Sequence, residues 1–294
     1  MDYVNKMREL PKKHDFFIGF DSDGCVFDTM EIKHKECFCP AFIKHFNLQA
    51  VSKYAREVWE FVNLYSKSRG SNRFLAVKEA LERIEKRPKC RERHIGDLTH
   101  HSLNQWLQEK NKLGNPALQR KIDSSGDAEL QEVLAWSEEV NERVSDMVIG
   151  IPPFPGVEDV LQCASGRADM IVVSQTPLEA LEREWKEHGI DDYMKLFCGQ
   201  EFGTKTEHLK YCAGEKYDPD KVLMVGDAPG DLKAARNNDV LFFPIVCGAE
   251  EASWRQFADE ALDRFFAGTF RGSYQDELLQ AFEKALPEKP PWQG

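Results

Sequence analysis

The stretch FFIGFDSDG, residues 16–24, decides the fold, because a run of apolar residues ends abruptly in two carboxylates that are one residue apart. Residues 16–20 are apolar on both faces of an extended strand, which is typical of a parallel strand covered by helices on both sides. Such a strand can expose charge only at its C-terminal end, where ligands bind in open α/β sheets. Asp21 and Asp23 are therefore expected at the mouth of a ligand site.

Two carboxylates this close repel each other unless a cation lies between them or one of them takes up a proton. The spacing of Asp21 and Asp23 thus indicates a divalent metal site, an acid/base pair, or both. Asp-x-Asp-Gly also occurs in calcium loops of the helix-loop-helix type, but these need a Glu at the twelfth loop position, where Ile32 stands here. A calcium loop of that type is therefore excluded.

A second apolar run, residues 170–173, leads into the tetrapeptide SQTP at residues 174–177. Thr176 and Pro177 have the form of a helix start, with an N-cap, a first-turn proline and an acid three residues after the cap. Ser174 and the amides after it are then expected at a helix N-terminus. There a hydroxyl, free N–H groups and the helix dipole make a natural phosphate cradle.

A third apolar run, residues 222–225, ends in GDAPGD at residues 226–231. This run brings two further carboxylates, Asp227 and Asp231, to the end of a strand. Because the carboxyl ends of parallel strands meet at one edge of a sheet, these acids are expected near the first acidic pair.

A cation is expected from Lys205, which lies between the second and third runs and just before another predicted helix start. Lys195 and Lys210 are alternatives for the same role. Lys210 is better explained as a residue on a helix face, and Lys195 as an exposed lysine. Lys205 is therefore the predicted cation of the site.

These elements, in this order on alternating strands and helices, resemble the haloacid dehalogenase-like (HAD) superfamily over about residues 14–29 and 150–250. The four motifs of the superfamily read here as DSDG at 21–24, Ser174, Lys205, and GDAPGD at 226–231. The resemblance implies an α/β fold with a Rossmann-like parallel sheet. Phosphatases and phosphomutases of the superfamily have an acid two residues after the nucleophile, whereas dehalogenases and phosphonatases lack it. Asp23 therefore favours phosphoryl transfer.

The resemblance also implies a role for each motif residue. Asp21 would be the nucleophile that forms an aspartyl-phosphate, and Asp23 would protonate the leaving oxygen and then activate water. Ser174 and Lys205 would bind the oxygens of the transferring phosphoryl group. Gln175 would add its backbone amide rather than its side chain.

A magnesium ion is the implied cofactor. It would be held by Asp21, the backbone carbonyl of Asp23 and Asp227, with Asp231 contributing directly or through water. The implied activity is a magnesium-dependent phosphatase for a small phosphorylated metabolite. Phosphoglycolate-like or sugar-phosphate compounds are suggested by analogy of fold. Two alternatives stay open: a phosphomutase or phosphotransferase with the same motifs, and a noncatalytic protein that binds phosphate and metal.

A long insertion separates the first two motifs, and its apolar positions recur with helical spacing. We expect an all-helical domain at residues 31–150 and a discontinuous catalytic core at residues 1–30 and 151–294. The insertion matches the cap of one HAD branch, and such a lid would contact the non-phosphate part of the substrate. Arg69 and Arg73 flank a turn in it and could clamp a carboxylate or a second phosphate. A solvated turn explains them equally well.

The composition is that of an ordinary globular protein, 41% hydrophobic and 30% charged. A net charge of −11 argues against nucleic acid or an anionic membrane as a partner. Residues 1–14 lack the apolar core of a signal peptide, so we expect a cytoplasmic protein. The eight cysteines are expected to be free thiols, and residues 287–294 a loose tail. The oligomeric state is unknown from the sequence.

Overall fold

The computed structural model describes residues 2–93, 95–109 and 113–293, and the chain divides into two compact units. The core unit comprises Met1–Met30 and Gly150–Pro287, and the helical unit comprises Glu31–Ile149 and Glu288–Gly294. The final residues thus group with the helical unit, whereas the sequence placed them in the catalytic core. Met1 and Gly294, the outer ends of the predicted ranges, lie outside the described residues.

The core unit is built on a five-stranded sheet in the order β3-β2-β1-β4-β5, in which every neighbouring pair is parallel. The strands are β1 (Phe16–Phe20), β2 (Ala168–Val173), β3 (Leu196–Cys198), β4 (Val222–Gly226) and β5 (Leu241–Pro244). The central strand β1 pairs with β2 on one side and β4 on the other. The predicted α/β fold with a parallel sheet is therefore confirmed.

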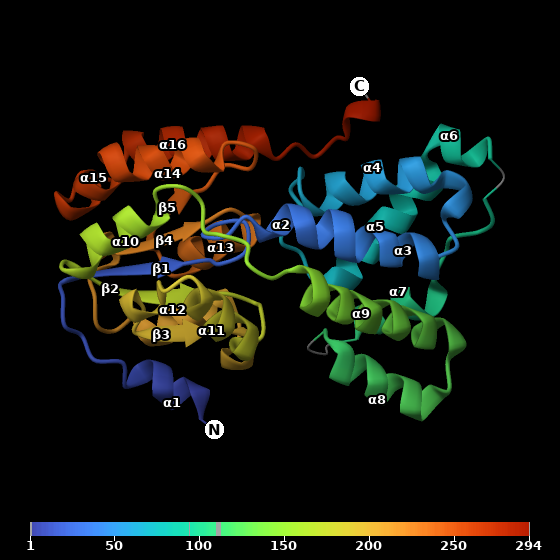
Figure 1. Ribbon diagram of the computed structural model, residues 1–294, viewed down its shortest axis with the longest axis horizontal. Coiled ribbons are helices and arrows are strands. Elements are labelled where there is room, and N and C mark those ends of the chain that lie inside the picture. Colours follow the sequence, from blue (N-terminus) through green and yellow to red (C-terminus); the bar gives the residue numbers. More distant parts are fainter. Residues whose placement is uncertain (1, 94, 110–112, 294) are drawn as a thin grey trace. The chain divides into compact units, whose positions relative to one another are not determined.

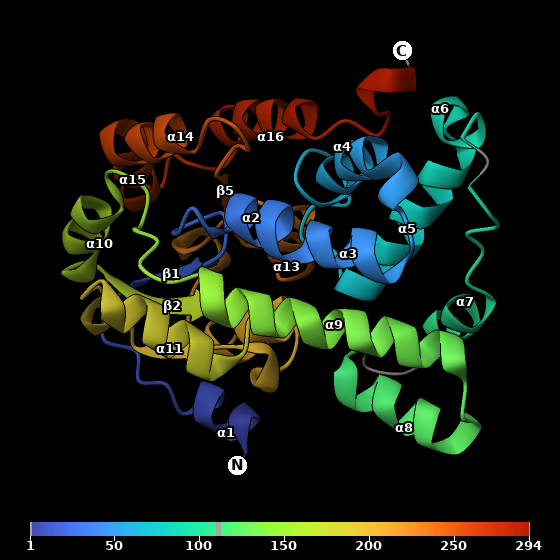
Figure 2. The ribbon, with the colours of Figure 1, turned by 45° about the vertical axis from the view of Figure 1, so that its right-hand side comes forward.

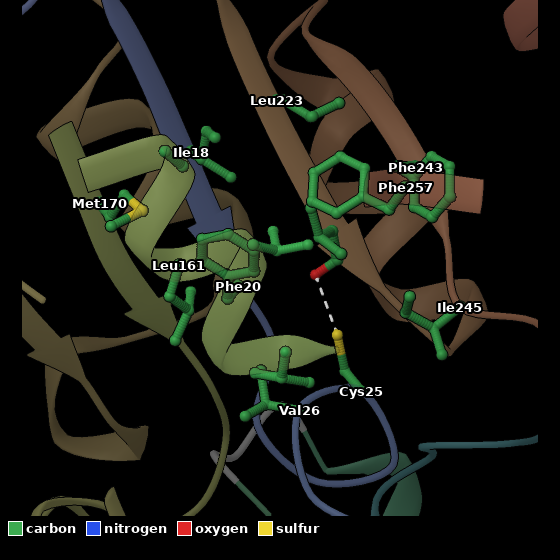
Figure 3. Packing of buried hydrophobic residues seen from close by; sticks show 14 of the residues in the cluster. Ile18, Phe20, Cys25, Val26, Leu161, Met170, Leu223, Phe243, Ile245 and Phe257 are labelled. Atoms are coloured by element: carbon green, nitrogen blue, oxygen red, sulfur yellow. Dashed lines mark hydrogen bonds between the residues drawn. The ribbon is translucent and has the colours of Figure 1, made fainter. Parts of the chain in front are cut away.

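Helices lie on both faces of this sheet (Figure 1). They are α1 (Tyr3–Arg8), α10 (Val157–Ser165), α11 (Leu178–Glu187), α12 (Lys205–Cys212), α13 (Pro229–Asn237), α14 (Glu250–Gln256), α15 (Leu262–Phe266) and α16 (Ser273–Ala285). A further short helix, α2 (Thr29–Ile32), follows the loop after β1 and is shared with the helical unit. Because side chains alternate along a strand, Ile18 and Phe20 join one apolar cluster (Figure 3) and Phe17 joins another. Both faces of β1 are consequently buried.

The loop after β1 is attached to the neighbouring strand β4. The thiol of Cys25 donates a hydrogen bond to the backbone carbonyl of Val225, with an S···O distance of 3.6 Å (Figure 3). The backbone N–H groups of Val26 and Phe27 donate to the carbonyl oxygen of Ser22 at 2.9 and 3.0 Å, which closes the loop into a tight turn. This turn holds the acidic pair at the end of the strand.

The described residues of the helical unit form helices and no strand. Its described helical segments of four or more residues, besides the end of α2, are η1 (Lys33–Phe38), α3 (Cys39–His45), α4 (Ser52–Asn63), α5 (Arg73–Lys86), α6 (Pro88–Arg91), α7 (His101–Gln108), α8 (Asn115–Ser125) and α9 (Ala128–Met147). The longest of them, α9, runs alongside α3 and α8 (Figure 2). The core of the helical unit is aromatic. The ring centroids of Trp59 and Trp136 are 6.0 Å apart, and those of Phe42 and Trp59 are 4.6 Å apart.

The C-terminal tail is not loose, contrary to the sequence prediction. The Glu288 carboxylate pairs with the ammonium group of Lys67 at 2.6 Å. The guanidinium of Arg87 lies 4.4 Å from the ring centre of Trp292, and the edge of that ring meets Phe61 with centroids 5.6 Å apart. A cation over an indole ring is attractive, so a tail of mostly polar residues and prolines is anchored by one tryptophan.

All eight cysteines are free thiols, and the sulfur atoms of Cys198 and Cys212 lie 4.0 Å apart. Among the helices that the structure describes, none combines the length and the apolar character that crossing a membrane requires.

Candidate active site

Asp21 is the first residue after β1, and one backbone contact and two side-chain contacts hold it. Its backbone N–H donates to the carbonyl oxygen of Val225 at 2.9 Å, which fixes the residue against β4. Its Oδ1 accepts a hydrogen bond from the backbone N–H of Ser22 at 2.8 Å, and its Oδ2 lies 2.8 Å from Nζ of Lys205. Asp21 is only 4% exposed. A carboxylate oxygen is thus placed directly beside a cation.

Lys205 is the first residue of α12, and Thr204 and Glu207 form a capping box at that helix end. The capping box fixes the start of the helix and with it the direction of the lysine side chain. Besides contacting Asp21, Nζ donates to Oδ1 of Asp231 at 2.6 Å. The structure therefore brings the predicted lysine, rather than Lys195 or Lys210, into the acidic cluster.

Three buried carboxylates meet at this edge of the sheet. Asp227 follows β4, and Asp231 lies in the first turn of α13, where its Oδ2 accepts from the backbone N–H of Ala228 at 3.0 Å. One oxygen each of Asp21, Asp227 and Asp231 lie within 4.8 Å of one another. Three carboxylates around one lysine leave an excess of buried negative charge. An all-oxygen donor set of this kind fits a hard divalent cation.

The pKa shifts reflect the burial of the site first and its excess of negative charge second. Burial raises the pKa of Asp21 to about 7, and the Asp231 carboxylate adds to the rise, whereas Lys205 opposes it. Burial likewise raises the pKa of Asp231. Burial alone would lower the pKa of Lys205, but the attraction of Asp21 and Asp231 outweighs it and raises that pKa above its usual range. The lysine stays charged, and the carboxylates are only partly compensated.

The close approach of Asp231 depends on a glycine at position 226. A Cβ atom added to Gly226 would lie 2.5 Å from Cβ and Cγ of Asp231, closer than carbon atoms can approach. No other residue type leaves space there for the Asp231 carboxyl in its present position.

Asp23 lies outside the group formed by the three buried carboxylates. Its Oδ1 accepts a hydrogen bond from the hydroxyl of Thr29, at the start of α2, and its Oδ2 accepts from the hydroxyl of Thr176 at 2.8 Å. The carboxyl of Asp23 is only half-buried. Its predicted metal contact runs through the backbone carbonyl and stays a prediction.

Thr176 is not the N-cap that the sequence predicted. Helix α11 begins at Leu178 with Pro177 as its N-cap residue, and no side chain caps it. The hydroxyl of Thr176 is instead used by Asp23, 153 positions earlier in the chain. No local pattern marks such a contact, so sequence reasoning missed the role of Thr176. It also missed Thr29, which is only six residues from Asp23.

Ser174 lies in the same loop and is 2% exposed. Its backbone N–H donates to the carbonyl oxygen of Cys198 at 2.9 Å, and its Oγ accepts from the backbone N–H of Thr176 at 3.1 Å. The exposed side chain of Gln175 donates through Nε2 to the carbonyl oxygen of Gly203 at 2.9 Å. The side-chain amide of Gln175 is therefore engaged by the backbone. The phosphate contacts of both residues stay predictions.

Ser22, which lies between Asp21 and Asp23, is also held by residues far away in the sequence. The indole N–H of Trp185, on α11, donates to Oγ of Ser22 at 3.0 Å, and this hydroxyl donates to Oε2 of Glu184 at 3.4 Å. Trp185 is fully buried and meets Phe27 edge to face. These contacts tie the acidic turn to α11, and the sequence gives no sign of them.

The two cap arginines, Arg69 and Arg73, contact other parts of the helical unit. Arg69 is 3% exposed and donates to the carbonyl oxygen of Leu64 at 2.9 Å. Arg73 donates to Oγ of Ser137 at 3.0 Å and to Oδ1 of Asn141 at 2.8 Å. These are the contacts of packing residues, and a substrate role for either arginine stays a prediction.

The sequence matches the model of the haloacid dehalogenase-like hydrolase family over residues 89–245, more than half of the chain. The matched range contains Ser174, Lys205, Asp227 and Asp231 and begins after Asp21. A search of curated proteins gives no match.

Solved structures show a distant likeness. A haloacid dehalogenase-like family hydrolase from Streptococcus pneumoniae is 12% identical, with 82% of this chain and 90% of that chain covered and a TM-score of 0.43. A protein described as a predicted phosphatase from Clostridium acetobutylicum is 14% identical, with 79% and 85% covered and a TM-score of 0.41. Likenesses this distant carry no conclusion about chemistry. On the family match, the chain belongs to the haloacid dehalogenase-like hydrolases.

Proposed function

We propose that this protein is a magnesium-dependent phosphatase that hydrolyses the phosphate monoester of a small metabolite through an aspartyl-phosphate on Asp21. The observation that carries the proposal is the cluster at the ends of β1 and β4, where Asp21 contacts Lys205 at 2.8 Å beside Asp227 and Asp231. Uncatalysed hydrolysis of such esters is among the slowest reactions, so strong compensation of charge is needed.

Asp21, Asp227 and Asp231 would hold the magnesium ion, because their oxygens already lie within 4.8 Å of one another. When bound, the ion supplies positive charge that offsets both the carboxylates and the oxygens of the phosphoryl group. Side chains of the protein bind and orient the substrate. Lys205 and Ser174 bind and orient the phosphoryl oxygens, so that Asp21 Oδ2 attacks phosphorus from a fixed direction.

Asp23 acts as the acid and base of the reaction. Its carboxyl gives a proton to the leaving oxygen when the aspartyl-phosphate forms and takes a proton from water when that intermediate is hydrolysed. It is held away from the three buried carboxylates by two hydroxyl groups. The separation leaves Asp21 as nucleophile and Asp23 as proton carrier.

The test is phosphate release from a panel of small phosphorylated metabolites, with magnesium, with EDTA, and with the variant Asp21→Asn. We expect turnover that needs the metal and is lost in Asp21→Asn while the variant still binds the substrate. Asp15→Asn is a matched control, because Asp15 is an exposed acid directly before the start of β1. We expect this variant to keep full activity. Unchanged activity of Asp21→Asn would exclude the mechanism, and release of an isomerised phosphate ester instead of free phosphate would indicate a mutase.

A further inference from the structure

Thr176 connects the acid Asp23 to the loop that carries Ser174. Its hydroxyl donates to Oδ2 of Asp23 at 2.8 Å, and its backbone N–H donates to Oγ of Ser174 at 3.1 Å. Its carbonyl oxygen accepts from the backbone N–H of Gln200 at 3.1 Å. All three polar groups of this residue are therefore engaged, and the residue has little freedom to move.

Asp23 needs such a contact because its carboxyl is attached to a turn and is only half-buried. The hydroxyl of Thr29 fixes one carboxyl oxygen, and the hydroxyl of Thr176 fixes the other from a different element. Two donors on two oxygens define the plane of the carboxyl group, which one donor alone does not. A hydroxyl can donate to a carboxylate and accept from a protonated acid, so the contact suits both states of a proton carrier.

Resting on the proposed phosphatase function, we propose that Thr176 is a positioning residue that orients Asp23 for proton transfer to the leaving group. As Oδ2 of Asp21 forms its bond to phosphorus, the bond from phosphorus to the leaving oxygen breaks and its electron pair stays on that oxygen. Asp23 supplies the proton to this oxygen. The contact between Thr176 and Ser174 holds the proton donor at a constant distance from the phosphoryl group.

The basicity of the leaving group separates this role from phosphate binding or folding. An alkyl alcohol leaves only with a proton, whereas the weakly basic nitrophenolate leaves without one. Thr176→Val keeps the shape of the side chain and removes the hydroxyl. We expect the single-turnover rate of aspartyl-phosphate formation, measured as release of the alcohol or phenol, to fall about 30-fold on glycerol 2-phosphate but less than about threefold on 4-nitrophenyl phosphate, with substrate binding nearly unchanged for both. This step is compared because the later hydrolysis of the aspartyl-phosphate also needs Asp23 and is the same for both compounds.

Thr176→Ser restores the hydroxyl and is expected to recover most of the lost rate. Thr269→Val is the matched control, because Thr269 is exposed and its hydroxyl donates to the carbonyl oxygen of Arg264, away from the acidic site. Equal losses of the single-turnover rate on the two compounds, or no loss on either, would overturn the positioning role.

The proposed function and the role of Thr176 fail in different ways. If the unaltered protein releases phosphate from neither compound, the proposed function fails. Crystal structures of the unaltered protein and of Thr176→Val then decide the positioning role. A changed side-chain rotamer of Asp23 in the variant supports it, and an unchanged rotamer overturns it.

Discussion

The core unit and the helical unit handle charge in opposite ways. In the core unit, Asp21, Asp227 and Asp231 surround one lysine, and burial raises the pKa of two of these acids. In the helical unit, the single carboxylate of Glu139 meets three basic side chains, and hydrogen bonds from them lower its pKa to about 2 against the opposing effect of burial. The core cluster therefore has more acidic than basic groups, and the cluster around Glu139 has more basic than acidic groups.

This difference separates a reaction site from a structural contact. A charged group whose partners exceed its own charge stabilises the fold, because its ionised form is favoured in the folded state. A cluster of like charges does the opposite and must be compensated by a ligand. The comparison therefore locates the site in the core unit without reference to motifs. Three substitutions test it.

The largest effect is expected from Lys205→Met, which removes the cation and keeps a similar length. We expect kcat to fall about 10³-fold, because the charge that we propose to bind the phosphoryl oxygens is lost. Without a divalent ion, the free energy of unfolding falls by about 3 kcal/mol, since three carboxylates are left with no cation. Urea denaturation with and without magnesium measures this, and the ion is expected to recover part of the loss.

Lys210→Met is the matched control for this prediction, since Lys210 is an exposed lysine on the same helix α12. It is expected to change neither kcat nor stability by more than a small factor. A larger loss of activity in Lys210→Met than in Lys205→Met would mean that Lys210, and not Lys205, is the functional cation.

A smaller effect is expected from Gly226→Ala. The new methyl group would lie 2.5 Å from Asp231, so the carboxyl must move away from Lys205. We expect a loss of about 2 kcal/mol in the free energy of unfolding and a fall in the affinity for magnesium. Denaturation and isothermal titration calorimetry measure the two.

Gly230→Ala, four residues later, is the control for the glycine prediction. A Cβ atom there meets nothing within 4 Å, and the residue lies inside α13, where alanine is favoured. This variant is expected to be as stable as the unaltered protein or slightly more so. If both alanine variants behave alike, the close contact between Gly226 and Asp231 is not what positions the acid.

Much of this cluster was predictable because each of its members follows a recognisable local pattern. The apolar run before Asp21 marks a buried parallel strand, and the run before Asp227 marks its neighbour. Since parallel strands end at one edge, their terminal acids must converge. Lys205 was identified by its place before a helix start. None of these steps needs knowledge of distant contacts.

The contacts that sequence reasoning missed depend on pairs of residues far apart in the chain. Thr176 has the sequence context of an N-cap, but its hydroxyl is used by Asp23, 153 positions away. Trp185 reads as an apolar helix residue, yet its indole N–H reaches Ser22 across 163 positions. The C-terminal tail has a disordered composition, and one ring, Trp292, anchors it. Local periodicity cannot predict which of many side chains meets a given partner.

The smallest effect is expected from Glu139→Gln in the helical unit, where the carboxylate accepts from Lys44 at 2.6 Å, from His45 at 2.8 Å and from Arg143 at 2.8 Å. Because the folded-state pKa of Glu139 is about 2 and its ordinary value 4.5, the ionised group stabilises the fold above pH 4.5, and this contribution disappears as the pH falls towards 2. At pH 7 the variant should lose about 1 kcal/mol of unfolding free energy, and the loss should vanish in acid. Denaturation of both proteins from pH 7 to pH 2 measures this difference. Glu138→Gln is the control, because Glu138 is the neighbouring exposed acid, and at pH 7 it should leave the free energy of unfolding nearly unchanged. A constant difference across the whole pH range would mean that shape, not charge, makes Glu139 important, and the contrast between the two units would then rest on the core cluster alone.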